Sequence, residues 1–437
     1  SPRSDAVLHW VHGGVYPRTD QEPVLSEFRR TGDLLPPVTL LGHVAPSGLA
    51  LPRSDTWGPE YRHNLFLAEF NTRRIMRVPL ERVGAGYRGH PQVFATAADN
   101  GVHFTDVIED ADGSLLVVDT GAWFRRGCPT SVVARADITG GIYRIRRSGL
   151  KAPADSRGNA LAWASDSVTT LAGRLGDLRP VVRDRAVSEL ARRGDAAVPA
   201  LTAALADANP LARSNAVWAL TRIGSVPAQA ALRRALQDRD AKVREAACQG
   251  AFVTADRAAA TSLVARLGDD ALPVQREAAR ALGRSRDARA VTALGGAAAI
   301  PRDPILTHAI IFALIEIAAP AETRRLLDHR EPLARRAALL ALDQMPGGQL
   351  TAEPVFAALA GTHPELRAAA LQIALRHPEW ARAAAAFLTT AAPQAAAPAT
   401  REIIERLLAA FLPAPEVRAW LRANLSAQAA AARLDLA

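Results

Sequence analysis

The stretch Asp207-Ala-Asn-Pro210-Leu-Ala-Arg213 recurs in modified form throughout the second half of this 437-residue chain. We call its proline position the anchor, and successive anchors are 30, 31, 32, 31, 28 and 32 residues apart. The anchors are Pro180, Pro210, Ala241, Pro273, Pro304, Pro332 and Pro364. A period in this range predicts a solenoid, in which stacked repeats bury their faces only against neighbouring repeats.

Charged residues flank the anchors in the same register. Three residues after each anchor except Pro304, where Thr307 stands, the chain has an arginine: Arg183, Arg213, Arg244, Arg276, Arg335 and Arg367. Three residues before the first four anchors it has an aspartate: Asp177, Asp207, Asp238 and Asp270. These residues could form an acidic or anion-binding surface, or they could tie the turn of one repeat to the next through charge-assisted hydrogen bonds. We favour the structural interpretation.

Apolar residues recur at intervals of three and four from about Leu161, which predicts helices. Proline is tolerated at a helix start, and the residue before the anchor is often a capping type, as at Asn209, Asp240 and Asp303. A small residue six positions after the anchor would let two helices approach closely: Ala186, Ala216, Ala247, Ala279, Ala338 and Ala370. A leucine then fills the space one turn later, at Leu190, Leu220 and Leu342. Each repeat is therefore predicted to be a helix pair, and the pattern resembles short HEAT-like repeats.

The ends and the composition of the chain set further limits. Two amphipathic stretches, residues 402–412 and 416–425, are predicted to cap the stack, and Trp218 is predicted to be a core residue rather than a ligand platform. The net charge of +9 could indicate a nucleic-acid partner, but no basic run is interleaved with stacking aromatics, so we expect none. No apolar run is long enough for a transmembrane helix. The two cysteines, Cys128 and Cys248, exclude a disulfide framework.

The first third of the chain has short β-branched runs separated by turn residues, which predicts a meander of strands. The runs are residues 64–70, 75–78, 105–108, 114–119 and 142–145. The acidic segment Glu109–Gly113 lies between two of them and could be a calcium loop, but it lacks the further ligands of an EF-hand. We favour a hairpin turn there. The spacing from Pro46-Ser-Gly-Leu to Phe104-Thr-Asp-Val suits the blades of a β-propeller.

Four motifs in this third carry a family resemblance: residues 43–50 (HVAPSGLA), 58–67 (GPEYRHNLFL), 106–119 (DVIEDADGSLLVVD) and 141–146 (GIYRIR). They resemble the C-terminal blades of glucose/sorbosone dehydrogenase-type propellers, in particular the predicted membrane-bound dehydrogenase branch. Residues 121–131 (GAWFRRGCPTS) resemble a marker of that branch. The resemblance implies incomplete propeller blades, about three, followed by an α-solenoid of HEAT-like helix pairs.

In its active members this family binds pyrroloquinoline quinone over a calcium ion and oxidises a sugar-like alcohol or aldehyde. The remaining blades and the family's catalytic histidine would lie upstream of Ser1. The family's cation positions fall on Asn71, His103 and Thr105, none of which carries the expected Lys or Arg. A desolvated tricarboxylate needs such cations. We therefore expect no cofactor or metal in this chain, with quinone and calcium possible only in a full-length member.

His43, Ser47, His103 and Asp106 are the remaining site candidates, since each lies near the predicted start of an inner strand, where propellers place channel residues. Each could instead be an ordinary hydrogen-bonded residue, and we favour that interpretation. His103 and Asp106 are three apart on a strand, so they should point to opposite faces.

These features predict four segments: a partial β-propeller (1–148), a linker (149–165), a HEAT-like solenoid of about seven repeats (166–390) and C-terminal capping helices (391–437). The predicted function is a protein-interaction scaffold joined to a non-catalytic propeller. Its partner would be a protein at the solenoid, with a carbohydrate as a further candidate ligand at the propeller. The alternatives are the C-terminal portion of a quinone-dependent sugar dehydrogenase and, on repeat likeness alone, a lyase. The family resemblance also implies a periplasmic or exported location.

Overall fold

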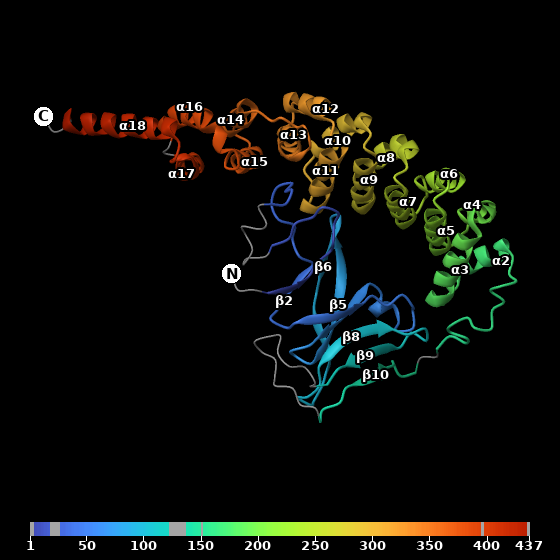
Figure 1. Ribbon diagram of the computed structural model, residues 1–437. Helices are drawn as coiled ribbons and strands as arrows, with labels where there is room; N and C mark the ends of the chain where they lie inside the picture. The colour runs from blue at the N-terminus through green and yellow to red at the C-terminus, as the bar shows by residue number, and fades with distance from the viewer. Residues whose placement is uncertain (1–3, 18–26, 122–136, 150–151, 395–396, 435–437) are drawn as a thin grey trace. The chain divides into compact units, whose positions relative to one another are not determined.

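The computed structural model describes residues 4–17, 27–121, 137–149, 152–394 and 397–434 (Figure 1). The chain divides into two compact units. The first unit comprises Ser1–Phe28, Leu34–Ala281 and Asp303–Ala309, and the second comprises Arg29–Asp33, Leu282–Arg302 and Ile310–Ala437. The first unit therefore contains the strands together with the earlier helices, and the second contains most of the later helices.

Antiparallel sheets form the strand part of the first unit. The strands are β1 (Asp5–Val7), β2 (Thr39–Gly42), β3 (Pro46–Ala50), β4 (Asn64–Glu69), β5 (Arg74–Val83), β6 (Gly86–Gly89), β7 (Gln92–Thr96), β8 (Phe104–Glu109), β9 (Leu115–Asp119) and β10 (Gly141–Ile145). β1 pairs with β2, and β3, β4 and β5 pair in order. The long strand β5 also pairs with β6 at one end and with β7 at the other. The third sheet has the order β10-β9-β8.

All five strand runs expected from the sequence are confirmed, as β4, β5, β8, β9 and β10. In the described residues none of the sheets closes on itself, so the sheets alone do not establish a propeller. The residues 122–131 of the predicted branch marker, including Cys128, lie outside the described part of the chain.

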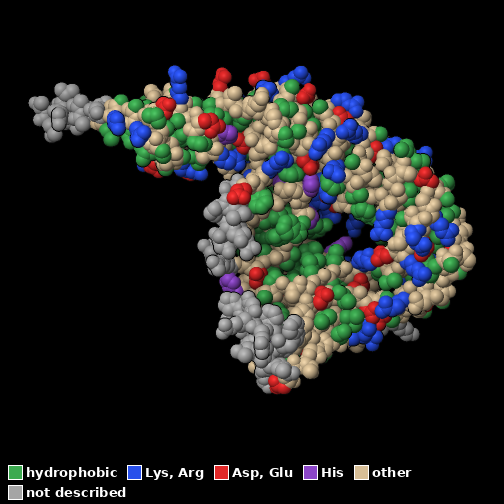
Figure 2. All heavy atoms as spheres, viewed as in Figure 1, with side chains coloured by type: hydrophobic (Ala, Val, Ile, Leu, Met, Phe, Trp, Pro, Cys, Tyr) green, Lys and Arg blue, Asp and Glu red, His purple; other side chains and the backbone are tan. Residues whose placement is uncertain are grey.

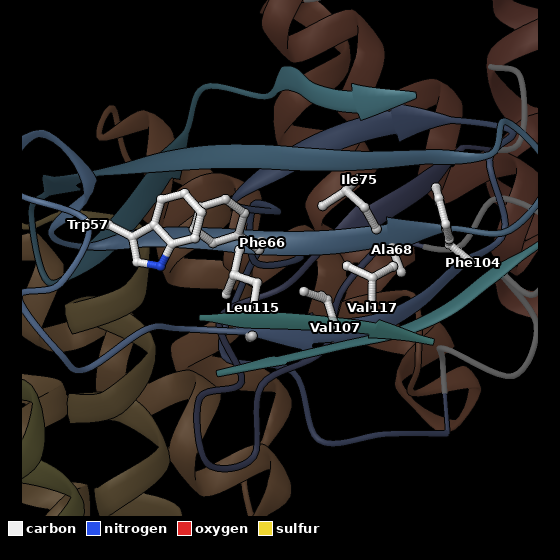
Figure 3. Packing of buried hydrophobic residues seen from close by; sticks show 9 residues of the cluster. Trp57, Phe66, Ala68, Ile75, Phe104, Val107, Leu115 and Val117 are labelled. Atoms are coloured by element: carbon white, nitrogen blue, oxygen red, sulfur yellow. The ribbon is translucent and has the colours of Figure 1, made fainter. Parts of the chain in front are cut away.

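The core of the strand part lies between two sheets. Phe66 and Ala68 of β4 and Ile75 of β5 face residues of β8 and β9 (Figure 3). Phe66, Ala68, Ile75 and Leu115 of β9 are completely buried, and Val117 of β9 is almost completely buried. Alternation of buried and less buried residues along β9 agrees with a strand that has one face in the core.

Helix pairs make up the rest of the molecule (Figure 1). Their bounds are α2 (Val168–Gly173), α3 (Pro180–Arg193), α4 (Val198–Ala204), α5 (Pro210–Ile223), α6 (Val226–Ala235), α7 (Ala241–Thr254), α8 (Ala260–Arg266), α9 (Leu272–Ser285), α10 (Val291–Ala298), α11 (Pro304–Ile317), α12 (Pro320–Arg325), α13 (Pro332–Gln344), α14 (Ala352–Ala360), α15 (Pro364–Ala374) and α16 (Ala381–Ala391). Six of the seven anchors are the first residue of a helix, and Pro273 is the second residue of α9. The predicted helix starts are confirmed.

The predicted caps and small residues are confirmed as well. The side chains of Asn209, Asp240 and Asp303 accept hydrogen bonds from backbone N–H groups in the first turns of α5, α7 and α11. The six alanines at the close-approach position are completely buried: Ala186, Ala216, Ala247, Ala279, Ala338 and Ala370. Trp218 on α5 is only half-buried, so it meets the core prediction in part.

Two further helices, α17 (Pro398–Phe411) and α18 (Pro415–Leu434), occupy the segments that were expected to cap the stack. In the described residues, no helix is both long enough and apolar enough to cross a membrane. Lys and Arg side chains are interspersed with Asp and Glu over the helices on the face shown in Figure 2. The basic excess of the chain is thus not gathered in a single patch on that face.

Candidate functional site

The sequence-selected residues His43 and Ser47 lie around the start of β3. His43 is exposed in the connection between β2 and β3. The hydroxyl of Ser47 lies 3.0 Å from the carbonyl oxygen of Phe104 and 3.2 Å from that of Ala68. Ser47 therefore ties β3 to β4 and β8 through backbone acceptors, as the structural interpretation expects.

His103 and Asp106 lie at the start of β8 and use different partners. The His103 ring is buried, with Nδ1 3.1 Å from the carbonyl oxygen of Gly101 and its centroid 4.6 Å from that of Phe70. The Asp106 carboxylate accepts the backbone N–H of Val107 at 2.8 Å. No hydrogen bond or ion pair joins any two of the four candidates within the described residues, so the structure does not assemble them into one reacting group.

The positions that match the family's cofactor-binding cations do not fit a tricarboxylate quinone. The hydroxyl of Thr105 faces the carbonyl oxygen of Val118 at 3.4 Å, and Asn71 lies in the turn after β4. Neither residue carries a positive charge, and the neighbouring Asp106 adds a negative one. Groups of three or more His, Cys, Asp or Glu side chains suited to a metal are absent from the described ranges.

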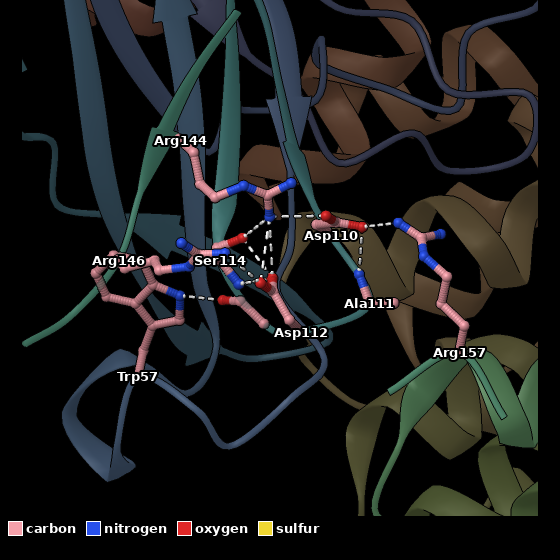
Figure 4. Close-up of polar contacts among 9 residues, drawn as sticks. Trp57, Asp110, Ala111, Asp112, Ser114, Arg144, Arg146 and Arg157 are labelled. Carbon is pink, nitrogen blue, oxygen red and sulfur yellow. Dashed lines mark hydrogen bonds and ion pairs between the residues drawn. The ribbon is translucent and has the colours of Figure 1, made fainter. Parts of the chain in front are cut away.

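The acidic segment before β9 is a hairpin turn, which confirms the favoured interpretation. Gly113 adopts a φ of 81°, and its N–H donates to the carbonyl oxygen of Asp110 at 2.9 Å. Arginines surround the carboxylates of Asp110 and Asp112 (Figure 4). Arg144 lies 2.7 Å and Arg157 2.5 Å from Asp110. The carboxylate oxygens are thus engaged by guanidinium groups of the chain itself.

The second carboxylate of this turn, Asp112, is ionised down to unusually low pH. Burial opposes its ionisation, but hydrogen bonds from Ser114 and Arg146 outweigh burial and lower the pKa of Asp112 to about 2. Arg146 contacts Asp112 at 3.0 Å. The turn is therefore an ion-pair network that fixes the β8–β9 hairpin to β10.

We call the anchor-plus-three arginines ladder arginines, and two of them, Arg213 and Arg244, join their repeat to the next one. Arg213 donates from Nε and Nη2 to Asp238 of the next repeat at 2.8 and 2.9 Å. Its Nη1 donates to the carbonyl oxygens of Asp207 and Ala208 in its own repeat. Burial opposes ionisation of Asp238, but the Arg213 hydrogen bonds hold the pKa of Asp238 below its usual value.

Arg244 repeats this geometry with one change from the prediction. It donates from Nε to Asp269 at 2.8 Å, and the Asp269 side chain is 1% exposed. Asp270, the residue predicted for this role, also contacts Arg244, but its side chain is 87% exposed. The exchange follows from the 32-residue step, because α9 begins one residue before its anchor and the turn ahead of it shifts by one. Asp269 accordingly accepts the N–H of Ala271, as Asp238 accepts that of Asp240.

A second row of the solenoid, four residues after each anchor, was missed in the sequence. This fourth-position row comprises Asp184, Ser214, Glu245, Glu277, His308, Arg336 and Ala368. In the first unit several of its members bind the strand part. Arg53 pairs with Asp184, and Arg82 lies 3.3 Å from Glu245. The sequence could have revealed this row, because each of its residues directly follows the anchor-plus-three position and therefore recurs with the period of the repeats.

The β5–β6 hairpin has the most detailed contact with this surface. The N–H of Ala85 at the hairpin tip donates to Asp303 at 3.1 Å, and the carbonyl oxygen of Ala85 accepts from Arg276. Asp303 also caps α11 through its other carboxylate oxygen. Ala85 is completely buried, so both backbone groups of this residue are satisfied by the solenoid.

Two histidines next to this hairpin are held in the neutral state. His9 packs edge-to-face on Tyr87, and burial together with the nearby Arg276 charge lowers the pKa of His9 to about 4. Burial also lowers the pKa of His308, whose Nε2 lies 2.9 Å from the carbonyl oxygen of His12. These groups serve packing between segments far apart in sequence.

Two grooves among the described residues of the second unit contain ladder arginines. One, of about 630 Å³, runs along α12–α15 and is lined by the ladder arginine Arg335 with Leu339 and Leu366. The other, of about 560 Å³, runs along α13, α15 and α17 and is lined by the ladder arginine Arg367 with Arg336 and Arg406. Thr362 lines both grooves.

The helix pairs agree with comparisons to known proteins. Residues 168–251 and 231–315 match the profile of HEAT repeats. No curated protein matches the chain. The comparisons support the predicted HEAT repeats. They give no support to the predicted dehydrogenase-type propeller.

Solved structures of other solenoids are also similar. They include the complex of CpcE and CpcF of phycocyanin lyase from Nostoc sp. PCC7120 (24% identity, 48% of this chain, 88% of that chain, TM-score 0.30). Kap121p bound to Pho4p matches at 14% identity over 55% of this chain and 32% of that chain, with a TM-score of 0.43. Human deoxyhypusine hydroxylase matches at 19% identity over 51% and 96%, with a TM-score of 0.24. The repeat assignment rests on the profile and on the helix pairs.

Proposed function

We propose that this chain, whose second half contains HEAT repeats, is a protein-interaction scaffold whose solenoid holds the strand part and offers its later repeats to a protein partner. The fourth-position row carries the proposal. Asp184 and Glu245 engage Arg53 and Arg82, and His308 contacts the backbone of His12. The acidic residues of this row thus already bind arginines of another segment of the same chain.

We further propose that the strand part is a divergent portion of a dehydrogenase-type propeller and is not catalytic. The order of β3, β4, β5 and β7 is an antiparallel meander, as in a propeller blade. β8, β9 and β10 would begin the next blade, and Gly48 of β3 packs against the backbone of Asp106 in β8. Asn71, His103 and Thr105 stand at the family's cation positions in place of the expected Lys or Arg, which supports the absence of quinone chemistry.

The second candidate is the C-terminal portion of a quinone-dependent sugar dehydrogenase whose catalytic blades lie upstream of Ser1. The same strand order favours it, since the blades would close only with further strands. A carbohydrate ligand at the propeller, an exported location and the domain boundaries at 148, 165 and 390 are further predictions. A lyase activity of the solenoid rests on repeat likeness alone.

The scaffold and the dehydrogenase make different predictions for quinone binding and for oxidation of a sugar. Protein extended by its upstream sequence would be titrated with pyrroloquinoline quinone and calcium and assayed for reduction of a dye acceptor with aldoses. We expect neither saturable quinone binding nor dye reduction. The scaffold proposal is wrong if the protein binds quinone and reduces the dye, and if His103→Ala or Asp106→Asn abolishes that turnover.

A further inference from the structure

The ladder arginines change partners along the solenoid. In the first unit, Arg213 and Arg244 each donate from Nε to an aspartate of the next repeat at 2.8 Å. In the second unit, the equivalent residues are Arg335 and Arg367. The position that would supply the carboxylate for Arg335 is Gly361, three residues before Pro364, and residues 393–398, before α17, contain no acidic residue at all.

Both later arginines keep a donor without an acceptor. Nε of Arg335 and Nε of Arg367 are buried and have no hydrogen-bond partner in the described ranges. The guanidinium of Arg335 makes no ion pair or hydrogen bond there, and that of Arg367 makes only a long contact of 3.4 Å to the hydroxyl of Thr400. The atom that is unused in both cases is the one that binds Asp238 and Asp269 in the earlier repeats.

Where the aspartates are missing, the arginine keeps a positive charge that is unpaired among the described residues and also lies beside an open groove. Arg335 and Arg367 line the two grooves of the second unit, whereas Arg213 is 3% exposed and covered by the next turn. Thr362 lines both grooves, so the two grooves adjoin at this residue. Apolar residues such as Leu339, Leu366 and Ile403 line the grooves beside the arginines.

We propose that Arg335 and Arg367 bind two carboxylates of one extended acidic segment of a partner protein, in the places that Asp238 and Asp269 fill in the earlier repeats. This inference rests on the proposed scaffold function and names its partner chemistry. Packed helices of adjacent repeats are about 10 Å apart. That distance corresponds to about one turn of the polyproline II conformation, which has three residues per turn and a rise of about 3.1 Å per residue, so two acidic residues three positions apart would lie on the same face.

The chemistry of the grooves favours a peptide over a nucleic acid. A bidentate guanidinium suits a carboxylate, and apolar lining suits the side chains between two acidic residues. Single-stranded nucleic acids need aromatic side chains for base stacking, and no Phe, Tyr or Trp of the described residues lines either groove. The lining of each groove also includes carboxylates, such as Asp328 and Glu365, which would repel a continuous phosphate backbone.

The test is binding of a fluorescein-labelled peptide containing Asp-Leu-Ala-Asp between Gly-Ser flanks, measured by anisotropy with the full chain at low salt. Replacing either arginine by the apolar Met removes one ion pair, so Arg335→Met and Arg367→Met should each weaken binding about tenfold. Arg330→Met is the matched control, because Arg330 has the same charge, a side chain 89% exposed and no place in the grooves. It should change the affinity by less than about twofold.

A gain-of-contact variant keeps the test independent of folding defects. Gly361→Asp places a carboxylate at the ladder position of the next repeat, where Gly361 has an ordinary φ of −70°. It should raise the melting temperature and displace the peptide from Arg335. Equal binding by an Asn-Leu-Ala-Asn peptide, equal effects of all three Met variants, or arginine-dependent binding of single-stranded DNA in place of the peptide would each overturn the inference. None of these results involves quinone chemistry. Failure of the peptide-binding test can therefore be distinguished from failure of the proposed scaffold function, which the quinone test measures.

Discussion

Gly84 at the tip of the β5–β6 hairpin meets two requirements that only glycine satisfies together. Its φ of 60° lies in the left-handed region, and an added Cβ would lie 2.6 Å from Cγ of Asp303. Asp303 cannot move freely away, because it caps α11 and binds the N–H of Ala85. One residue thus sets how closely the hairpin approaches the solenoid within the first unit.

We therefore expect Gly84→Ala to destabilise the protein by about 2 kcal/mol or more, from backbone strain and from loss of the Ala85 contact. Thermal unfolding measures the loss, and hydrogen exchange should report faster exchange in β5 and β6. Gly149→Ala is the control, since Gly149 has a φ of 78° but nothing within 4 Å of its added Cβ. Equal losses in the two variants would show that the contact with Asp303 is unimportant.

The elements of the solenoid could be read from the sequence with good accuracy because their signals are local. Proline at a helix start, a capping side chain before it and a small residue on the buried face lie within one helix of each other. Asp269 marks the limit of this reasoning. The sequence register selected Asp270, and only the actual start of α9 shows that the turn moves by one residue.

The ladder contact between repeats should contribute strongly to stability. Arg213→Met would leave the Asp238 carboxylate, 9% exposed, with the N–H of Asp240 as its one remaining hydrogen-bond partner among the described residues. Removing one partner of a buried pair costs about 3–5 kcal/mol, so urea unfolding should show a loss of that order. Arg335→Met, at the same place in a later repeat but without a carboxylate partner, should cost clearly less.

A double-mutant cycle with Asp238→Asn isolates the pair itself. The double variant Arg213→Met/Asp238→Asn should be more stable than the sum of the single losses implies, since neither charge is then buried alone. Additive losses would contradict a direct interaction between the two side chains.

At the scale of the whole molecule, the first unit combines strands with helices that follow them much later in the chain. Arg82 and Glu245 are 163 residues apart in sequence, and Arg276 and Ala85 are 191 apart. Folding of the strand part should therefore depend on the solenoid. This dependence is expected to be greatest for the β5–β6 hairpin, whose buried tip has its hydrogen-bond partners on α9 and at the start of α11.

A fragment of residues 1–165 tests this dependence. The β5–β6 hairpin should exchange its amide hydrogens much faster in the fragment than in the full chain, because Arg276 and Asp303 are missing. The β9–β10 pair is an internal control, since Asp110, Asp112, Arg144 and Arg157 are all retained. Unchanged protection of β5 and β6 would mean that the strand part is stable without the helices.

The sequence by itself determined the repeat register, the helix starts with their caps, the buried alanines, the main strands and the hairpin turn at Glu109–Gly113. Each of these depends on backbone preference, capping or periodic burial within a few tens of residues. Only the tertiary structure decided which partner each charge takes. It gave Arg213 a carboxylate, left Nε of Arg335 without one among the described residues, and placed Asp184 and Glu245 against arginines of the strand part within the first unit. Such pairings depend on contacts between segments distant in the chain, and no local pattern fixes them.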